Sequence, residues 1–178
     1  MKVYGVTGWK NSGKTTLVER LVAEIAGRGF TVSTLKHAHH SFDVDHPGKD
    51  SHRHRMAGAS QVLVSSRARW ALMTENRAGP EPALADLLAR LDPVDLVLIE
   101  GYKRDRHPKI EARRLATAQS LIAAEDPTVE AIATDAPRDA LAGAAALPVF
   151  DLDDIAGIAD FILDRTGLPR GLPRQGAG

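Results

Sequence analysis

The chain has 178 residues, of which 43% are hydrophobic and 26% charged, a composition that fits one ordinary globular domain and excludes wholesale disorder and fibrous repeats. Lys and Arg together number 23, as do Asp and Glu, so no net charge draws the chain toward nucleic acid or an anionic membrane. There is no cysteine, which excludes disulfides, thiolate metal sites and cysteine nucleophiles. We expect a soluble, cytoplasmic protein, because no signal-peptide pattern and no apolar run near the ~20 residues that cross a bilayer are present.

Strand and helix patterns alternate along the chain and predict an α/β fold, with a mostly parallel sheet and helices on both faces. Residues 2–7 are rich in strand formers, and apolar residues then recur at helical spacing from Lys14 to about Gly27. Residues 31–35 have the composition of a second strand. A βαβ opening of this kind requires parallel strands.

The middle of the chain predicts an extension of the sheet domain. After a short helix over residues 50–57, residues 61–66 and 70–74 have the pattern of a short β-hairpin. A helix is expected over residues 82–91. Residues 96–99 are continuously apolar, as in a strand that is buried on both faces.

The last third of the chain completes the alternation. Residues 109–113 alternate charged and apolar side chains and are expected at an edge of the sheet, while residues 129–133 have the pattern of another buried strand. A final helix over residues 153–165 begins at Asp153 or Asp154 as its cap. We therefore expect a single nucleotide-binding domain over residues 1–166, followed by a flexible tail over residues 167–178.

Residues 8–15, Gly-Trp-Lys-Asn-Ser-Gly-Lys-Thr, match the P-loop pattern between a strand and a helix, where that motif belongs. Glycines let backbone N–H groups surround a phosphate, and the positive end of the helix dipole faces the same anion. Lys14 is expected to bridge the β- and γ-phosphates, and the Thr15 hydroxyl to ligate Mg²⁺. The alternative interpretation is a glycine-rich turn with one solvated lysine. The predicted nucleotide contacts in this loop are Gly8, Lys10, Asn11, Ser12, Gly13, Lys14, Thr15 and Thr16.

A nucleotide site with Mg²⁺ also needs a carboxylate at the end of a neighbouring buried strand, to hold the ion or its water. Glu100 directly follows the apolar run at 96–99 and is the candidate. In isolation it would be interpreted as a solvated carboxylate at a strand end.

Six of the seven histidines lie between residues 37 and 54, directly after the second predicted strand. One interpretation is an anion site in which Lys36 and His37 face the phosphates, together with Lys49, Arg53 and Arg55. A second is a transition-metal site formed by His39, His40, His52 or His54. A third is a set of surface histidines on a mobile loop. The acidic residues of the same stretch could bind Mg²⁺ or position water; these are Asp43, Asp45 and Asp50.

Three stretches together resemble the MobB family, the GTP-binding proteins of molybdopterin-guanine dinucleotide synthesis. They are the P-loop, residues 36–51 with Lys-His-x-His-His and Pro-Gly-Lys-Asp-Ser, and residues 98–103, Leu-Ile-Glu-Gly-Tyr-Lys. The resemblance covers roughly residues 1–165 in the same order. It implies a P-loop α/β fold, a homodimer, GTP with Mg²⁺ and weak GTP hydrolysis. It also implies a partnership with MobA, the guanylyltransferase that joins GMP to molybdopterin, and molybdopterin as a further ligand.

The resemblance also implies residue roles. Lys14, Glu100 and Asp45 are expected to act in catalysis, and Thr15, Glu100 and Asp43 at the metal. The guanine-specific Asn/Thr-Lys-x-Asp pattern is absent, and Asp135 is the nearest candidate for contacting the base. Two other functions fit the P-loop: a small-molecule kinase, and a metallochaperone GTPase that uses the histidine-rich loop.

Overall fold

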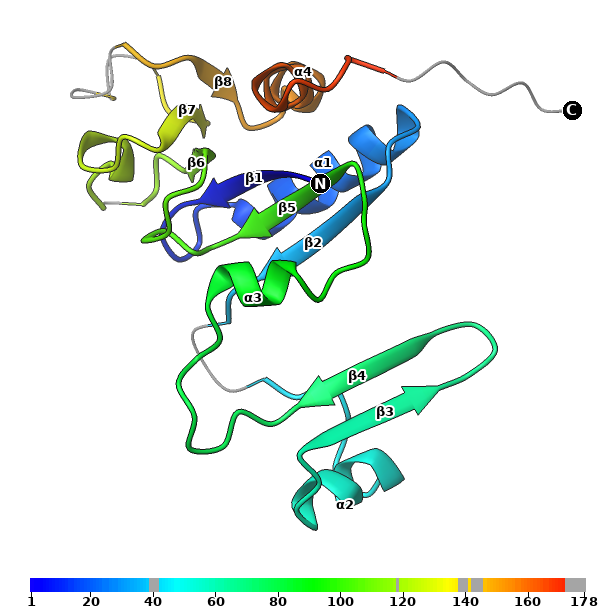
Figure 1. The fold of residues 1–178 in the computed structure, drawn as a ribbon. Coiled ribbons are helices and arrows are strands. Elements are labelled where there is room, and N and C mark those ends of the chain that lie inside the picture. The colour runs from blue at the N-terminus through cyan, green and yellow to red at the C-terminus, as the bar shows by residue number, and fades with distance from the viewer. Residues whose placement is uncertain (39–41, 118, 138–140, 142–145, 172–178) are drawn as a thin grey trace, which may run out of the picture. The chain divides into compact units, whose positions relative to one another are not determined.

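The structure of the protein, a computed structural model, describes residues 1–38, 42–117, 119–137, 141 and 146–171. The chain divides into two compact units (Figure 1): a first unit of residues 1–37 with 90–178, and a second unit of residues 38–89. The sequence predicted one domain over residues 1–166, and folding as one domain stays a prediction. No helix in the described ranges is both long and apolar enough to cross a membrane.

A six-stranded sheet forms the centre of the first unit. Its strand order is β2-β5-β1-β6-β7-β8, and every neighbouring pair is parallel. The strands are β1 (Lys2–Thr7), β2 (Val32–Lys36), β5 (Leu96–Glu100), β6 (Lys109–Arg113), β7 (Val129–Thr134) and β8 (Val149–Asp151). The predicted fold class, a mostly parallel sheet with helices and an added hairpin, is confirmed.

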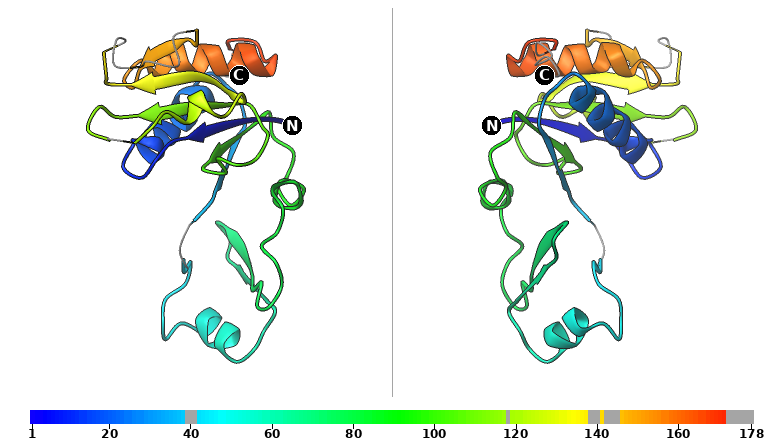
Figure 2. Two further views of the ribbon diagram at one scale, coloured as in Figure 1. Left: turned by 90° about the vertical axis from the view of Figure 1, so that its left-hand side faces the viewer. Right: turned by 90° about the vertical axis from the view of Figure 1, so that its right-hand side faces the viewer.

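Two helices cover one face of this sheet: α1 (Lys14–Gly27) and α4 (Ile155–Thr166). They pack against each other and against β1, and α1 lies along the sheet in both views of Figure 2. Side chains spaced three and four apart on the helices, such as Leu17 and Leu21 on α1, bury themselves among alternate residues of the strands, such as Tyr4 and Leu98. Because successive strand residues point to opposite faces, the remaining strand residues lie on the face away from α1 and α4.

That opposite face contains buried charged residues. They are tolerated there because groups of nearby loops form hydrogen bonds or ion pairs with them. Lys109 is fully buried, and its Nζ donates to the carbonyl of Asp105 at 2.5 Å and to Asp126 Oδ2 at 3.1 Å. Glu111 is also fully buried and accepts from two backbone N–H groups of the 3-10 helix η1 (Ile122–Ala124) at 2.8 and 3.1 Å. The prediction that residues 109–113 form an edge strand is therefore wrong, since β6 lies between β1 and β7.

The second unit contains α2 (Asp50–Met56), the hairpin strands β3 (Gln61–Ser65) and β4 (Trp70–Thr74), and α3 (Leu84–Leu88). The hairpin is antiparallel, with Leu63 opposite Leu72, as the sequence predicted. The helix expected over residues 82–91 is shorter than predicted, since only residues 84–88 are helical.

Two further details differ from the sequence analysis or refine it. The strand β8, only three residues long, was not predicted, because so short a segment has no measurable alternation. Asp154 is the residue that caps α4, and its Oδ1 accepts from the N–H of Gly157 at 3.0 Å.

Candidate functional site

The loop between β1 and α1 has a backbone that needs glycine at its two ends. Gly8 has a φ of +145° and Gly13 a φ of +93°, and Asn11 between them also has a positive φ of +63°. A Cβ atom on Gly8 would lie 2.3 Å from the backbone oxygen of Ala112, so no other residue fits there. The loop thus enters α1 with its backbone turned as the P-loop pattern predicts.

Lys14 is the first residue of α1, and its side chain folds back over the loop. Its Nζ donates to the carbonyl of Trp9 at 2.6 Å. Burial lowers the pKa of Lys14, Lys103 and Lys36 lower it further, and Glu100 opposes them. The ammonium group of Lys14 therefore lies near enough to those of Lys103 and Lys36 to be repelled by both, and an anion beside it would relieve that repulsion.

Thr15, Glu100 and Lys36 meet beside this lysine. Thr15 Oγ1 donates to Glu100 Oε1 at 2.7 Å, and Lys36 Nζ lies 3.2 Å from the same oxygen. They come from the start of α1 and from the carboxyl ends of β5 and β2, which are neighbours in the sheet. A hydroxyl and a carboxylate in contact are the oxygen ligands that Mg²⁺ prefers, so the pair fits that ion.

Two buried hydroxyls at the base of the loop also fit an anionic ligand. Ser12 is 1% exposed and Thr7 is fully buried, and neither hydroxyl oxygen has a hydrogen-bond partner within the described part of the chain. An unpaired buried hydroxyl is costly, and phosphate oxygens are strong acceptors. The other predicted contacts of the loop, Lys10, Asn11 and Thr16, are exposed.

His37 continues from β2 and lies against the turn that follows Glu100. Its backbone N–H donates to the carbonyl of Glu100 at 3.0 Å, and its ring centroid lies 4.8 Å from that of Tyr102. Tyr102 itself has a positive φ of +46°. The structure therefore brings both Lys36 and His37 to the same turn as Glu100, as the sequence predicted for the carboxyl ends of parallel strands.

Asp135, the candidate for contacting a base, lies just after β7 and already has partners. Its Oδ1 accepts from the N–H of Leu115 at 2.6 Å, and its Oδ2 lies 3.4 Å from Arg114 Nη1. Arg114 in turn lies beside the P-loop, because a Cβ on Gly13 would be 3.3 Å from its Nε atom. Asp135 thus connects the loops after β6 and β7.

Asp43 and Asp45 belong to the second unit, where both pair with one arginine. Arg55 lies 2.9 Å from Asp43 and 2.6 Å from Asp45, and its third partner is Glu75 at 2.7 Å. The hydrogen bond from Arg55 holds the pKa of Asp45 below its usual value. The roles predicted for these two aspartates, at the metal and in catalysis, stay predictions.

The histidine-rich stretch does not show a metal site among the residues that the structure describes. His39 and His40 lie outside the described residues, and His52 and His54 lie on α2. Over the described ranges, no three His, Asp or Glu side chains are grouped so that they could hold a metal ion.

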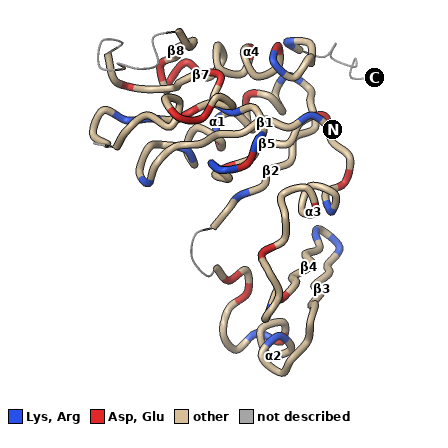
Figure 3. Tube along the Cα trace, turned by 60° about the vertical axis from the view of Figure 1, so that its left-hand side comes forward, with Lys and Arg blue, Asp and Glu red and all other residues tan. Residues whose placement is uncertain are grey.

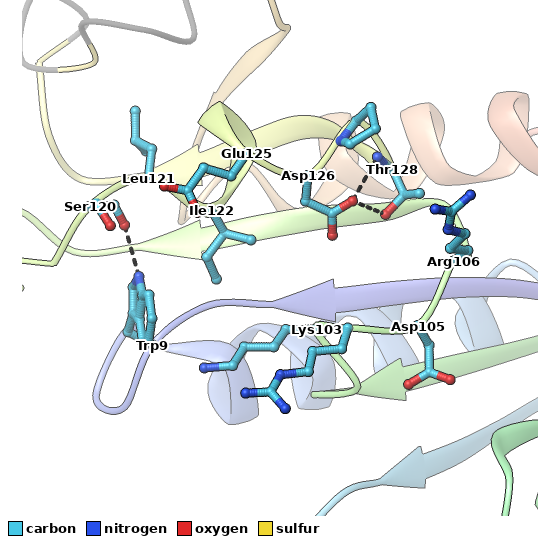
Figure 4. Close-up of a pocket in the computed structure, with 12 residues that line it drawn as sticks. Trp9, Lys103, Asp105, Arg106, Ser120, Leu121, Ile122, Glu125, Asp126 and Thr128 are labelled. Carbon is cyan, nitrogen blue, oxygen red and sulfur yellow. Dashed lines mark hydrogen bonds between the residues drawn. The ribbon is translucent and has the colours of Figure 1, made fainter.

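Two residues near the P-loop were not assigned by the sequence analysis. Trp9 Nε1 donates to the carbonyl of Ser120 at 2.8 Å, and Lys103 Nζ lies 4.0 Å from the centre of the Trp9 ring. Both line a cavity of about 570 Å³ (Figure 4). The sequence offered two signals, the place of Trp9 within the P-loop motif and the mainly basic run at residues 103–106 that begins three residues after Glu100.

Charge is otherwise mixed along the molecule. In the view of Figure 3, basic and acidic positions are interspersed in both units. The positive charge at the P-loop is therefore local, and it comes from the three lysines described above together with Lys10 of the loop and Arg114 beside Gly13.

Comparison with known proteins agrees with the geometry of the loop. The family model "MobB: Molybdopterin guanine dinucleotide synthesis protein B" matches residues 3–135. The molybdopterin-guanine dinucleotide biosynthesis adapter protein of Escherichia coli K12 is 38% identical over 161 residues, 88% of each chain. The adapter protein of the same name in Haemophilus influenzae is 42% identical over 161 residues, 89% of this chain and 85% of that one.

Solved structures show the same fold. The X-ray structure of a MobB protein homolog from Bacillus stearothermophilus has a TM-score of 0.65 at 30% identity, covering 94% of this chain and 99% of that chain. The crystal structure of Bacillus subtilis MobB has a TM-score of 0.73 at 28% identity, covering 93% and 98%.

Proposed function

The chain belongs to the MobB family, and from this we propose that it binds GTP with Mg²⁺ as an accessory protein of molybdopterin-guanine dinucleotide biosynthesis. In this role it acts in the cytoplasm and assists the guanylyltransferase that joins GMP to molybdopterin. Hydrolysis of GTP by this protein is weak and secondary to that assistance.

The observation that supports nucleotide binding best is the contact between Thr15 and Glu100, with Lys14 and Lys36 beside it. Lys14 and Lys36 would hold the phosphate oxygens, and Thr15 with Glu100 would hold Mg²⁺, which supplies charge neutralisation at the phosphates.

The adapter role predicts a gain in product when the protein is added to its partner. A guanylyltransferase supplied with molybdopterin and GTP·Mg²⁺ should form the dinucleotide several-fold faster with this protein present than without it. The Lys14→Ala variant should give no acceleration, while Lys2→Ala, changed at the other end of β1, should act as the unchanged chain does. Equal rates with and without the protein would contradict the proposal.

Glu100 gives a prediction that separates metal binding from nucleotide binding. Glu100→Gln keeps an acceptor for the Thr15 hydroxyl but removes the charge, so the Mg²⁺ concentration needed for half-maximal GTP hydrolysis should rise about tenfold. Affinity for GTP should change much less. The measurement is the hydrolysis rate against Mg²⁺ concentration, and an unchanged curve would make Glu100 a structural carboxylate.

The hairpin supports the proposal of a homodimer. A two-stranded hairpin is marginally stable alone, and its apolar side chains Leu63, Trp70 and Leu72 are 60%, 64% and 46% exposed. A second copy of the chain pairing with this surface would cover them.

The dimer can be tested by sedimentation. Leu72→Glu should convert the dimer to a monomer, because a carboxylate would be buried in the contact. Arg69→Glu, in the turn between the strands, is the matched control and should leave the dimer intact. A dimer of unchanged strength in Leu72→Glu would place the contact elsewhere.

A further inference from the structure

The cavity beside Trp9 lies wholly within the first unit, and the nucleotide site does not account for it. The loop that follows β5 forms one wall, the segment over residues 120–128 forms the facing wall, and Trp9 closes one end (Figure 4). Its volume of about 570 Å³ is in the range of pockets that bind small molecules.

The wall that follows β5 is basic and available for an anion. It contains Asp105 together with three basic residues, Lys103, Arg104 and Arg106, and none of these three forms an ion pair with a carboxylate among the described residues. Lys103 lies over the Trp9 ring and also lowers the pKa of Lys14, so this wall reaches from the cavity toward the P-loop.

The facing wall offers an oriented carboxylate. Asp126 Oδ1 accepts from the N–H and the hydroxyl of Thr128 at 2.9 and 2.6 Å, and Oδ2 accepts from Lys109 Nζ at 3.1 Å. Burial alone would raise the pKa of Asp126, but these bonds lower it below its usual value. These three bonds hold the carboxylate in place and leave one lone pair, on Oδ2, that can accept from a ligand. Glu125 beside it is exposed.

Apolar side chains of the facing wall and of the closed end also line the cavity. They are Trp9, Leu121, Ile122 and Pro127. Two of them are anchored, since Trp9 donates to Ser120 and the N–H of Ile122 donates to Glu111. Apolar walls with a few fixed polar groups are typical of sites that bind small molecules and cofactors.

We propose that this cavity binds a 2-amino-4-oxopyrimidine ring that carries a phosphate. Of the adjacent N–H donors of such a ring edge, one matches the open lone pair on Asp126 Oδ2 and its neighbour the carboxylate of Glu125, while the phosphate matches Lys103 and Arg104. Guanine and pterin share this edge. The choice of ligand rests on the proposed function, because both rings occur in the dinucleotide that the names of the relatives contain.

The test uses tryptophan fluorescence. The chain has two tryptophans, so Trp70→Phe, changed at an exposed position on the hairpin, leaves Trp9 as the only reporter. Neopterin monophosphate added to this variant in saturating GTP·Mg²⁺ should quench Trp9 saturably. Neopterin without the phosphate should bind at least about tenfold more weakly, because the bonds to Lys103 and Arg104 are lost.

Variants then locate the binding. Arg104→Ala should weaken neopterin monophosphate binding about tenfold and leave GTP affinity unchanged, while Arg67→Ala on the hairpin turn should change neither. Lys14→Ala should lose GTP and keep the quenching of Trp9. The two proposals can therefore fail separately: loss of the adapter effect leaves this binding intact, and absent quenching leaves GTP binding intact.

Each remaining outcome is decisive. Quenching by GMP under saturating GTP·Mg²⁺ supports the shared ring edge with guanine as its source, and quenching by neopterin monophosphate alone identifies pterin. The proposal is overturned if neither compound binds, if neopterin binds equally with and without its phosphate, or if binding displaces GTP.

Discussion

Replacing Lys14 with alanine should lower the affinity for GTP·Mg²⁺ by at least about 100-fold, since charged hydrogen bonds to two phosphates are lost at about 1.5–3 kcal/mol each. The thermal midpoint of unfolding should stay the same or rise slightly. Lys14 is half-buried among other lysines, its pKa is lowered by burial, and its hydrogen bond is to the carbonyl of Trp9. Removing it therefore relieves the burial of a charge and the repulsion from Lys103 and Lys36, which offsets the loss of its hydrogen bond and of its attraction to Glu100.

Calorimetry with GTP measures the affinity, and differential scanning calorimetry measures the midpoint. Lys2→Ala, at the far end of β1, is the matched control and should bind GTP normally. Full affinity in a folded Lys14→Ala variant would show that the loop is not the nucleotide site.

The same titrations repeated with ATP test the base preference that we propose for Asp135. Asp135→Asn keeps an acceptor for the N–H of Leu115 and so spares the loop, but it no longer offers two carboxylate oxygens to guanine. The variant should lose most of the preference for GTP over ATP. An intact preference would assign base selection to other residues.

His107 should make the protein less stable in acid by about 3 kcal/mol between pH 6.5 and pH 4. Burial lowers the pKa of His107 from 6.5 to about 4, and nearby Lys109 lowers it further against the opposing Asp105 and Asp126. The ring is 8% exposed and neither nitrogen has a partner among the described residues. It is packed so closely on β1 that a Cβ at Gly5 would lie 2.5 Å from its Nε2 atom.

The sign follows from proton binding. Between pH 4 and 6.5 the unfolded chain holds a proton on this histidine and the folded chain does not, so lowering the pH favours unfolding until the folded pKa is reached. His107→Leu should remove this part of the pH dependence of the unfolding free energy, measured by urea titration at each pH. His54→Leu, changed at an exposed site, should keep it. Parallel pH curves for His107→Leu and the unchanged chain would show that the ring is protonated in the folded state.

The sequence by itself determined the P-loop and the family. Glycines at 8 and 13, followed by Lys14 and Thr15, constrain a short stretch of backbone whose conformation depends on local sterics, so spacing alone predicts it. The predicted βαβ opening is likewise local, and the structure confirms it with only small changes in the bounds of the elements.

Only the tertiary structure decided how charged residues are used. β6 alternates charged and apolar residues like an edge strand, yet it is central. Lys109 can be buried there because its carboxylate partner, Asp126, comes from 17 residues away, and Glu111 because it accepts from N–H groups at least 11 residues away. The cavity beside Trp9 likewise combines three segments that are far apart in the sequence. Whether a buried charge is satisfied depends on which distant groups the fold brings within hydrogen-bond distance, and no local pattern contains that information.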